Sequence, residues 1–231
     1  MNQTKVLLTG GCSFSDAIRP GTDTWPIHLS NYLKEYKHVH TGMGSQGNGL
    51  ISRKILYNLL DILESHSPAD VLVGIMWSSP ERYEHFSNDY QVGVMQNFRE
   101  NPTNFTGGQG AWKHLTPNLE DDLSSMYYKY WQNELLSLVQ TYEHILRVQW
   151  FLKLHNIKYF MTFAFNVFKN HTNPECKYLY NEIDWTRFLP VNSQLHWCKL
   201  NSNYEFLDAK HPSSEQHLEF TQQVILPFLK L

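Results

Sequence analysis

Short apolar runs alternate with amphipathic segments along most of the chain, and this alternation predicts the fold class. Apolar runs typical of buried strands occupy three places, 5–9, 70–77 and 157–164, and a short second strand is predicted at 37–41. Apolar residues at helical spacing fill three of the segments that follow: 25–33, 50–64 and 123–154. Strands that alternate with helices are typical of a parallel sheet covered by helices on both faces. We therefore expect an α/β fold with a mostly parallel sheet of about five strands.

The end of the chain supplies the last elements of this pattern. A short fifth strand is predicted near Tyr204–Leu207. The last helix is predicted to begin after Pro212, where Ser213 and Gln216 have the spacing of a capping box. Both elements complete a single layered sheet, and no linker divides the 231 residues. We expect one domain that spans residues 1–231.

The stretch between about residues 78 and 120 interrupts the alternation. Glycine, asparagine and scattered aromatic residues replace the periodic apolar pattern there. Long irregular segments within compact domains are usually lids or binding loops. We therefore predict a lid or insertion over the site at this place in the chain.

Charge and cysteine usage narrow the classes of partner. Charged residues make up 18% of the chain and the formal net charge is −3, so the sequence lacks the basic surface that nucleic acids require. Three cysteines are too few for a disulfide framework and favour a reducing compartment, which we take to be the cytoplasm. No apolar run approaches the roughly 18 residues of a spanning helix. We expect no cofactor, no nucleic-acid partner and no membrane span.

Two short stretches, far apart in the sequence, carry the candidate chemistry. Ser13 follows the first predicted strand on a glycine turn, at the edge of an α/β sheet where ligands bind. Serine is a weak nucleophile until a general base removes its proton and a third group orients that base. His211 and Asp208, three residues apart before a helix, supply both groups. We predict that Ser13, His211 and Asp208 meet as a catalytic triad.

These residues resemble the SGNH hydrolases, also called GDSL-type esterases and lipases. The family's first block, Gly-Asp-Ser-Leu-Ser, resembles the stretch Gly11–Ser15 and places the nucleophile on Ser13. Its last block, Asp-x-x-His, resembles Asp208–His211. The resemblance implies a three-layer α/β/α, flavodoxin-like sandwich and hydrolysis of a carboxylic ester through an acyl-enzyme. Transfer of the acyl group to another acceptor is a close variant of that reaction.

The resemblance also implies an oxyanion hole, and here the sequence departs from the family. The backbone N–H of Ser13 is one expected donor, and the second block places another on Gly44 or Ser45. The third block, Gly-x-Asn-Asp, should follow the third strand, where this chain has Ser78 and Ser79 and no asparagine. Ser78, Ser79 or the nearby Asn48 is expected to replace the missing donor. A donor of this kind is worth about 3–4 kcal/mol in the transition state.

Three other patterns compete with the triad. Gly42-x-Gly44-x-x-Gly47 matches a dinucleotide fingerprint, but it follows the second strand and the next strand ends without an acidic residue. Cys12 is an alternative nucleophile beside Ser13. His38 and His40 share one face of a strand, but two histidines are weak evidence for a metal and we expect none to bind.

Substrate class follows from the aromatic content and the resemblance together. Aromatic residues make up 14% of the chain, and their flat faces suit a sugar ring. We expect a small-molecule or carbohydrate ester, with an O-acetyl group on a carbohydrate as the favoured case. The alternative is a catalytically weak or inactive protein of the same fold that binds or assembles, because the third-block asparagine is missing.

Overall fold

The structure is a computed structural model that describes residues 4–16, 22–87, 111–117, 121–166, 173–208 and 211–231. Its central sheet has four parallel strands in the order β2-β1-β3-β6. Their bounds lie within a residue of the predicted runs: β1 (Lys5–Gly10), β2 (Tyr36–His40), β3 (Val71–Trp77) and β6 (Lys158–Phe163). The expected α/β class with a mostly parallel sheet is confirmed.

The predicted fifth strand near Tyr204–Leu207 is wrong, because this segment is irregular. Its backbone groups bond to a turn and a helix rather than to a neighbouring strand. The Leu207 N–H donates to the carbonyl oxygen of His211 at 2.9 Å, and the Tyr204 carbonyl accepts a bond from Gln216 Nε2 at 2.9 Å.

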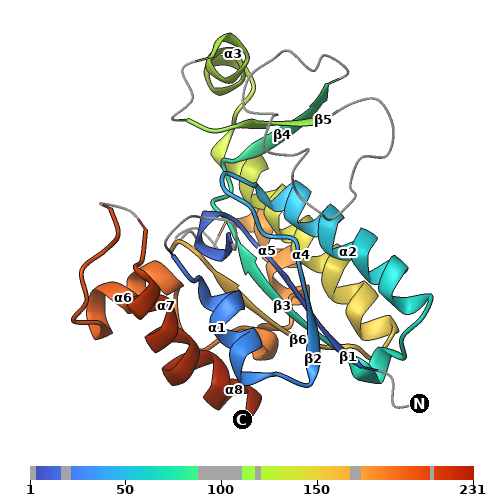
Figure 1. Cartoon of the computed structure of the whole chain (residues 1–231). Coiled ribbons are helices and arrows are strands. Elements are labelled where there is room, and N and C mark those ends of the chain that lie inside the picture. Colours follow the sequence, from blue (N-terminus) through green and yellow to red (C-terminus); the bar gives the residue numbers. More distant parts are fainter. Residues whose placement is uncertain (1–3, 17–21, 88–110, 118–120, 167–172, 209–210) are drawn as a thin grey trace.

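Successive side chains of the strands point to opposite faces of the sheet and enter two hydrophobic cores. All odd-numbered residues of β3, from Val71 to Trp77, belong to the first core. Leu72 and Met76 belong to the second. Figure 1 shows the two groups of helices that cover these faces. The first core is covered by α2 (Asn48–Leu63), α4 (Glu134–Leu154) and α5 (Pro174–Glu182). The second is covered by α1 (Trp25–Tyr32), α6 (Gln194–Asn201), α7 (Ser214–Phe220) and α8 (Leu226–Leu229).

The last helical segment begins as the sequence indicates. The capping box at the start of α7 is confirmed: Gln216 N donates to Ser213 Oγ and Ser213 N donates to Gln216 Oε1. A π-helical turn at Thr221–Ile225 then joins α7 to α8. Among the described residues, no helix combines the length and apolarity needed to cross a membrane.

The long helical pattern at 123–154 is two helices, α3 (Asp122–Tyr130) and α4. Asn133 ends the interruption, because its side chain accepts the N–H of Leu136 and caps α4. Helix α3 lies away from the sheet, next to a second, two-stranded antiparallel sheet made of β4 (Tyr83–Ser87) and β5 (Ala111–Leu115) (Figure 1). These elements occupy the predicted insertion; its remaining parts, 88–110 and 118–120, lie outside the described residues.

Glu84 on β4 joins this small sheet to the main body. Its carboxylate accepts the backbone N–H of Gly47 and, at 3.2 Å, that of Leu50, so it caps the N-terminus of α2. The side chain is 5% exposed, and burial raises its pKa to about 7 despite the two bonds. Helix N-termini favour negative groups because their first N–H groups lack partners within the helix.

We predict that Glu84→Ala lowers the free energy of unfolding by about 2–4 kcal/mol, since it leaves two backbone N–H groups at the start of α2 without acceptors. Urea unfolding followed by circular dichroism measures this loss. Glu81→Ala is the matched control, because the contact recorded for Glu81 with Tyr128 uses its backbone carbonyl. Equal losses in the two variants would contradict the capping role.

Candidate active site

Ser13 lies on a tight turn that leaves the carboxyl end of β1. The turn is a single 3₁₀ turn, Ser13–Ser15, closed by a bond from Ser15 N to the Cys12 carbonyl at 2.8 Å. Trp25 Nε1 donates to the buried Ser15 Oγ at 2.8 Å and ties the turn to α1. Gly11 is required here, because a Cβ at that position would clash with Ser15 Oγ and lie 2.9 Å from the Met76 carbonyl oxygen. The nucleophile candidate therefore sits on a backbone fixed from both sides.

The structure brings Ser13, His211 and Asp208 together. His211 Nε2 lies 3.0 Å from Ser13 Oγ, although 198 residues separate the two in sequence. His211 Nδ1 lies 3.0 Å and 2.9 Å from the two carboxylate oxygens of Asp208. A carboxylate can only accept, so Nδ1 carries the proton and Nε2 is left as an acceptor for the Ser13 hydroxyl.

The loop that carries His211 is held by its own backbone and by an aromatic neighbour. His211 N donates to Asp208 Oδ1 at 2.9 Å, so one carboxylate fixes both the backbone and the ring. The Phe14 ring lies 5.5 Å from the His211 ring, centroid to centroid. The His211 side chain is 25% exposed and that of Asp208 is 45% exposed, so this pair faces solvent rather than the core.

Of the predicted oxyanion donors, Gly44 is already engaged. Its N–H donates to Asp16 Oδ2 at 2.8 Å, which joins the loop after β2 to the end of the Ser13 turn. Ser45 follows with a φ of 65°, the left-handed conformation that turns the chain sharply before α2. An incoming oxyanion would reach the Gly44 N–H only if the Asp16 carboxylate moved.

Asn48 is also engaged, in the buried packing of α2. Its Nδ2 donates to the Ser78 carbonyl at 3.2 Å and to Thr141 Oγ1 at 3.0 Å, and its Oδ1 accepts the Ser78 N–H at 2.7 Å. The residue is 2% exposed. Both hydrogens of the amide are used, so Asn48 holds the end of β3 and offers no donor to a ligand in this arrangement.

Ser79 is the predicted donor that borders open space. With Phe165 it lines a cavity of about 790 Å³. Phe165 also packs edge-on against Phe14, with ring centroids 4.9 Å apart, so this cavity adjoins the aromatic side of the Ser13 turn. Ser78, by contrast, is 1% exposed and lies beneath Asn48.

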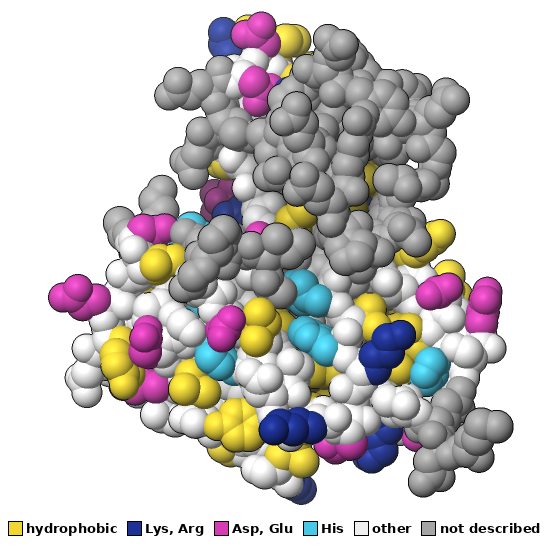
Figure 2. Space-filling view, viewed as in Figure 1, with side chains coloured by type: hydrophobic (Ala, Val, Ile, Leu, Met, Phe, Trp, Pro, Cys, Tyr) yellow, Lys and Arg dark blue, Asp and Glu magenta, His cyan; other side chains and the backbone are white. Residues whose placement is uncertain are grey.

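The rings of His38 and His40 both hydrogen-bond to the hydroxyl of Thr9. Thr9 Oγ1 lies 2.7 Å from His38 Nε2 and 2.8 Å from His40 Nδ1. Figure 2 shows histidine side chains in the middle of the face turned toward the viewer, where the edge strand β2 runs in Figure 1. Burial lowers the pKa of His38 to about 4 and that of His40 to about 3, so both rings are neutral near pH 7. Within the described residues, no three His, Cys, Asp or Glu side chains are grouped to hold a metal ion.

The other two competing patterns have structural roles here. Cys12 is fully buried, and it points into the second core. All three cysteines lie in the described part of the chain, and each is a free thiol. At the glycine-rich loop, the Gly47 N–H at the start of α2 is occupied by Glu84, and a Cβ on Gly47 would lie 2.6 Å from the Arg82 carbonyl. The place where a dinucleotide phosphate would bind is therefore filled by a carboxylate.

Sequence reasoning missed the charged groups beneath the site. Lys54 on α2 is 1% exposed, and its pKa is lowered to about 8 by burial although the charges of Asp16 and Glu84 oppose this. Asp16 follows the nucleophile block directly, so its acidic side chain was a visible signal. Lys54 and Glu84 gave none, because each stands in an ordinary helix or loop pattern and only the fold brings them together.

The comparisons with known proteins identify a family and a fold. A model of a family of unknown function, DUF6071, matches residues 16–223. The chain belongs to this family. The matched region contains Asp208 and His211 and begins three residues after Ser13. Among curated proteins, none matches the sequence of this DUF6071 member.

Solved structures resemble the DUF6071 chain over nearly its whole length. TesA is 12% identical, with a TM-score of 0.53 and 98% of each chain covered. Axe2, an acetylxylan esterase from Geobacillus stearothermophilus, is 15% identical, with a TM-score of 0.49 and coverage of 98% of this chain and 94% of that one. At such identities the likeness to TesA shows a shared fold, in agreement with the layered sheet described above.

We predict that the DUF6071 protein loses stability as the pH falls below about 6.5, because its buried histidines stay neutral when folded and take up protons when unfolded. Each such histidine contributes up to about 1.4 kcal/mol per pH unit. His40→Gln should therefore show a shallower loss of the free energy of unfolding between about pH 6.5 and 5. Urea unfolding at several pH values measures both slopes, and parallel slopes would contradict the prediction.

Proposed function

We propose that this protein is a serine esterase that cleaves a carboxylic ester through an acyl-enzyme. One observation carries the proposal: the hydrogen-bonded series from Ser13 Oγ through the His211 ring to the Asp208 carboxylate. The series has the order that nucleophilic catalysis needs, with the hydroxyl at the edge of the sheet and the carboxylate behind the base. The fold shared with TesA supports it at the level of architecture.

In this proposal His211 moves a proton twice. Ser13 Oγ attacks the ester carbonyl carbon while His211 Nε2 takes the hydroxyl proton, and Asp208 stabilises the imidazolium that results. The tetrahedral intermediate collapses, the C–O bond to the alcohol breaks, and His211 returns the proton to the departing oxygen. Water then attacks the acyl-Ser13 with the same assistance, which releases the acid and restores the serine. An alcohol in place of that water gives acyl transfer.

The oxyanion donors we propose are the backbone N–H groups of Ser13 and Ser45 and the hydroxyl of Ser79. These groups leave adjacent parallel strands at one edge, since Thr9 pairs with His40 and Gly10 pairs with Ile75. The Gly44 N–H joins them only when Asp16 releases it. Asn48 takes no part, because its amide is committed to Ser78 and Thr141.

The substrate we propose is a carbohydrate ester, with an O-acetyl group as the reacting part. The cavity beside Ser79 holds about 790 Å³, which is room for a sugar rather than for an acetyl group alone. Phe165 and Tyr128 offer flat faces, and Gln132 and Asn166 offer amide groups that pair with hydroxyls.

The first test is covalent labelling. The wild type should react with a fluorophosphonate probe and hydrolyse p-nitrophenyl acetate, and Ser13→Ala should lose both activities, because the nucleophilic oxygen is gone. Cys12→Ala is the matched control one residue away and should keep both. Labelling that survives Ser13→Ala, or that depends on Cys12, would exclude the triad.

The second test separates two neighbouring serines. We predict that Ser79→Ala lowers kcat for the ester by about a hundredfold, since a preorganised oxyanion donor is typically worth that much or more. Ser78→Ala should leave kcat nearly unchanged, because the Ser78 side chain is buried and only its backbone bonds to Asn48. Similar kcat values for wild type and Ser79→Ala would exclude Ser79 as a donor.

A second candidate function is binding without catalysis. The observations that favour it are the bonds that already occupy Gly44 N–H and the Asn48 amide, the two donors nearest in role to those of the SGNH hydrolases. A folded protein that neither reacts with the fluorophosphonate nor cleaves the ester would support this reading. In that case the cavity beside Ser79 is a binding site for an unmodified sugar, which calorimetry with xylo-oligosaccharides would test.

A further inference from the structure

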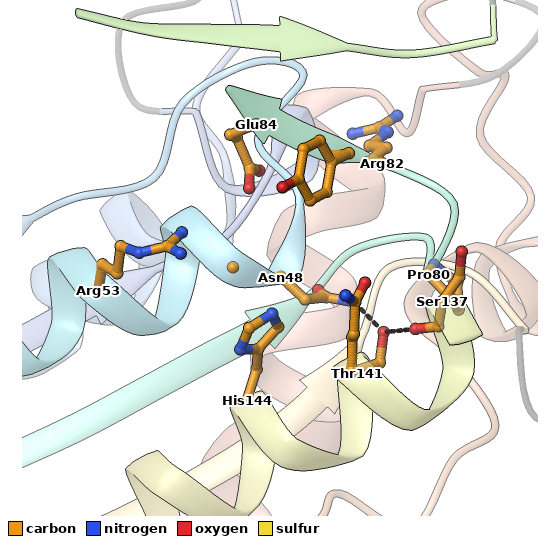
Figure 3. Close-up of a pocket in the computed structure, with 11 residues that line it drawn as sticks. Asn48, Arg53, Pro80, Arg82, Glu84, Ser137, Thr141 and His144 are labelled. Carbon is orange, nitrogen blue, oxygen red and sulfur yellow. Dashed lines mark hydrogen bonds between the residues drawn. The ribbon is translucent and has the colours of Figure 1, made fainter. Parts of the chain in front are cut away.

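A second, smaller cavity lies between the N-terminal turns of α2, the strand β4 and helix α4 (Figure 3). Its volume is about 130 Å³, and the polar groups that line it include Asn48, Arg53, Glu84, Ser137, Thr141 and His144. None of the proposed triad residues lines it, and none of the motifs discussed above predicts it. Its lining is charged and polar, which is unusual for a space left by imperfect packing.

Three of these polar groups converge on the backbone of Gly49. A Cβ at this glycine would lie 3.0 Å from Glu84 Oε2, 3.1 Å from Arg53 Nη1 and 3.3 Å from His144 Nε2. Side chains from three separate elements therefore point at one spot, as the close-up in Figure 3 shows for Arg53 and His144. The absence of a side chain on Gly49 leaves that spot accessible.

The groups that remain available at this spot are hydrogen-bond donors. Arg147 Nη2 lies 3.4 Å from His144 Nδ1, and a guanidinium can only donate, so Nδ1 accepts and Nε2 carries the hydrogen. Burial, with the charges of Arg147 and Arg53, lowers the pKa of His144 to about 4, so the ring is neutral and keeps this tautomer. The Arg53 guanidinium, placed 4.6 Å from the Trp112 ring, has only donors to offer.

Two of the side chains that line the cavity already use their acceptor oxygens within the protein. The carboxylate of Glu84 accepts the N–H groups of Gly47 and Leu50. Thr141 Oγ1 accepts from Asn48 Nδ2 and donates to the Ser137 carbonyl, the bonds drawn in Figure 3. A ligand that carries acceptors therefore meets the ring N–H of His144 and the cationic guanidinium of Arg53.

We propose that this cavity binds a small oxyanion, a carboxylate or a phosphate, held by the Arg53 guanidinium and His144 Nε2–H. Guanidinium groups bind such anions through two parallel N–H bonds. The volume matches, since a cavity of about 150 Å³ holds benzene and these anions are no larger. Arg147 adds a second positive charge near Arg53, and Glu84 is neutral in part near pH 7 because burial raises its pKa to about 7.

Isothermal titration calorimetry on the full chain tests the proposal with two probes, sodium acetate and sodium phosphate, at constant ionic strength set by sodium chloride. At least one of them should bind saturably to the wild type with one site per chain, and the two arms show whether the planar or the tetrahedral anion fits. Absence of saturable binding for both anions at millimolar concentrations would overturn the proposal.

Two variants tie the binding to the cavity. Gly49→Ala places a methyl group at the meeting point and should weaken binding at least tenfold; it should also fold, because alanine favours a helix more than glycine does. His144→Leu removes one donor without filling that point and should weaken binding by several-fold. His66→Leu, in the turn just after the far end of α2, is the control and should bind as the wild type does. Wild-type affinity in both Gly49→Ala and His144→Leu would overturn the proposal, as would equal loss in the control.

Discussion

Parallel strands impose the constraint on which this structure depends. Their carboxyl ends all lie on the same side of the sheet, so every segment that follows a strand starts there. Strands β1, β2 and β3 are adjacent, so strand order alone places the turns at Ser13, Gly44 and Ser79 next to one another. The chain end must then reach that edge from another layer. His28 on α1 supports this arrangement, because its Nε2 lies 3.1 Å from the Ser214 carbonyl at the start of α7.

The sequence was most informative where burial is continuous. Strands β1, β3 and β6 were predicted to within a residue because a strand covered on both faces carries apolar side chains on both. The segment Tyr204–Leu207 misled for the same reason: it has apolar residues, but its backbone bonds go to His211 and Gln216. A short apolar run predicts burial, but it does not predict which groups the backbone will hydrogen-bond to.

For the candidate site, the sequence motifs predicted where the triad residues lie, but the long-range hydrogen bonds could not be predicted. The placement of Ser13 at a strand end and of His211 before a helix follows from sequence neighbours, and the strand order then brings them within 3.0 Å. The bond from Gly44 to Asp16 and the cap that Glu84 places on α2 join segments with no fixed spacing between them. Such pairs are chosen by tertiary packing, so the state of the oxyanion donors became visible only in the structure.

The shared hydroxyl of Thr9 couples the tautomers of two histidine rings behind the nucleophile turn. A hydroxyl has a single proton, so Thr9 Oγ1 donates to one of the two nitrogens, His38 Nε2 or His40 Nδ1, and accepts a bond from the other. One neutral ring therefore carries its hydrogen on the nitrogen that faces Thr9, and the other ring carries it on the opposite nitrogen. Neither ring can change its tautomer alone without losing its bond to this hydroxyl, although both rings come from the edge strand and the threonine comes from the strand that leads to Ser13.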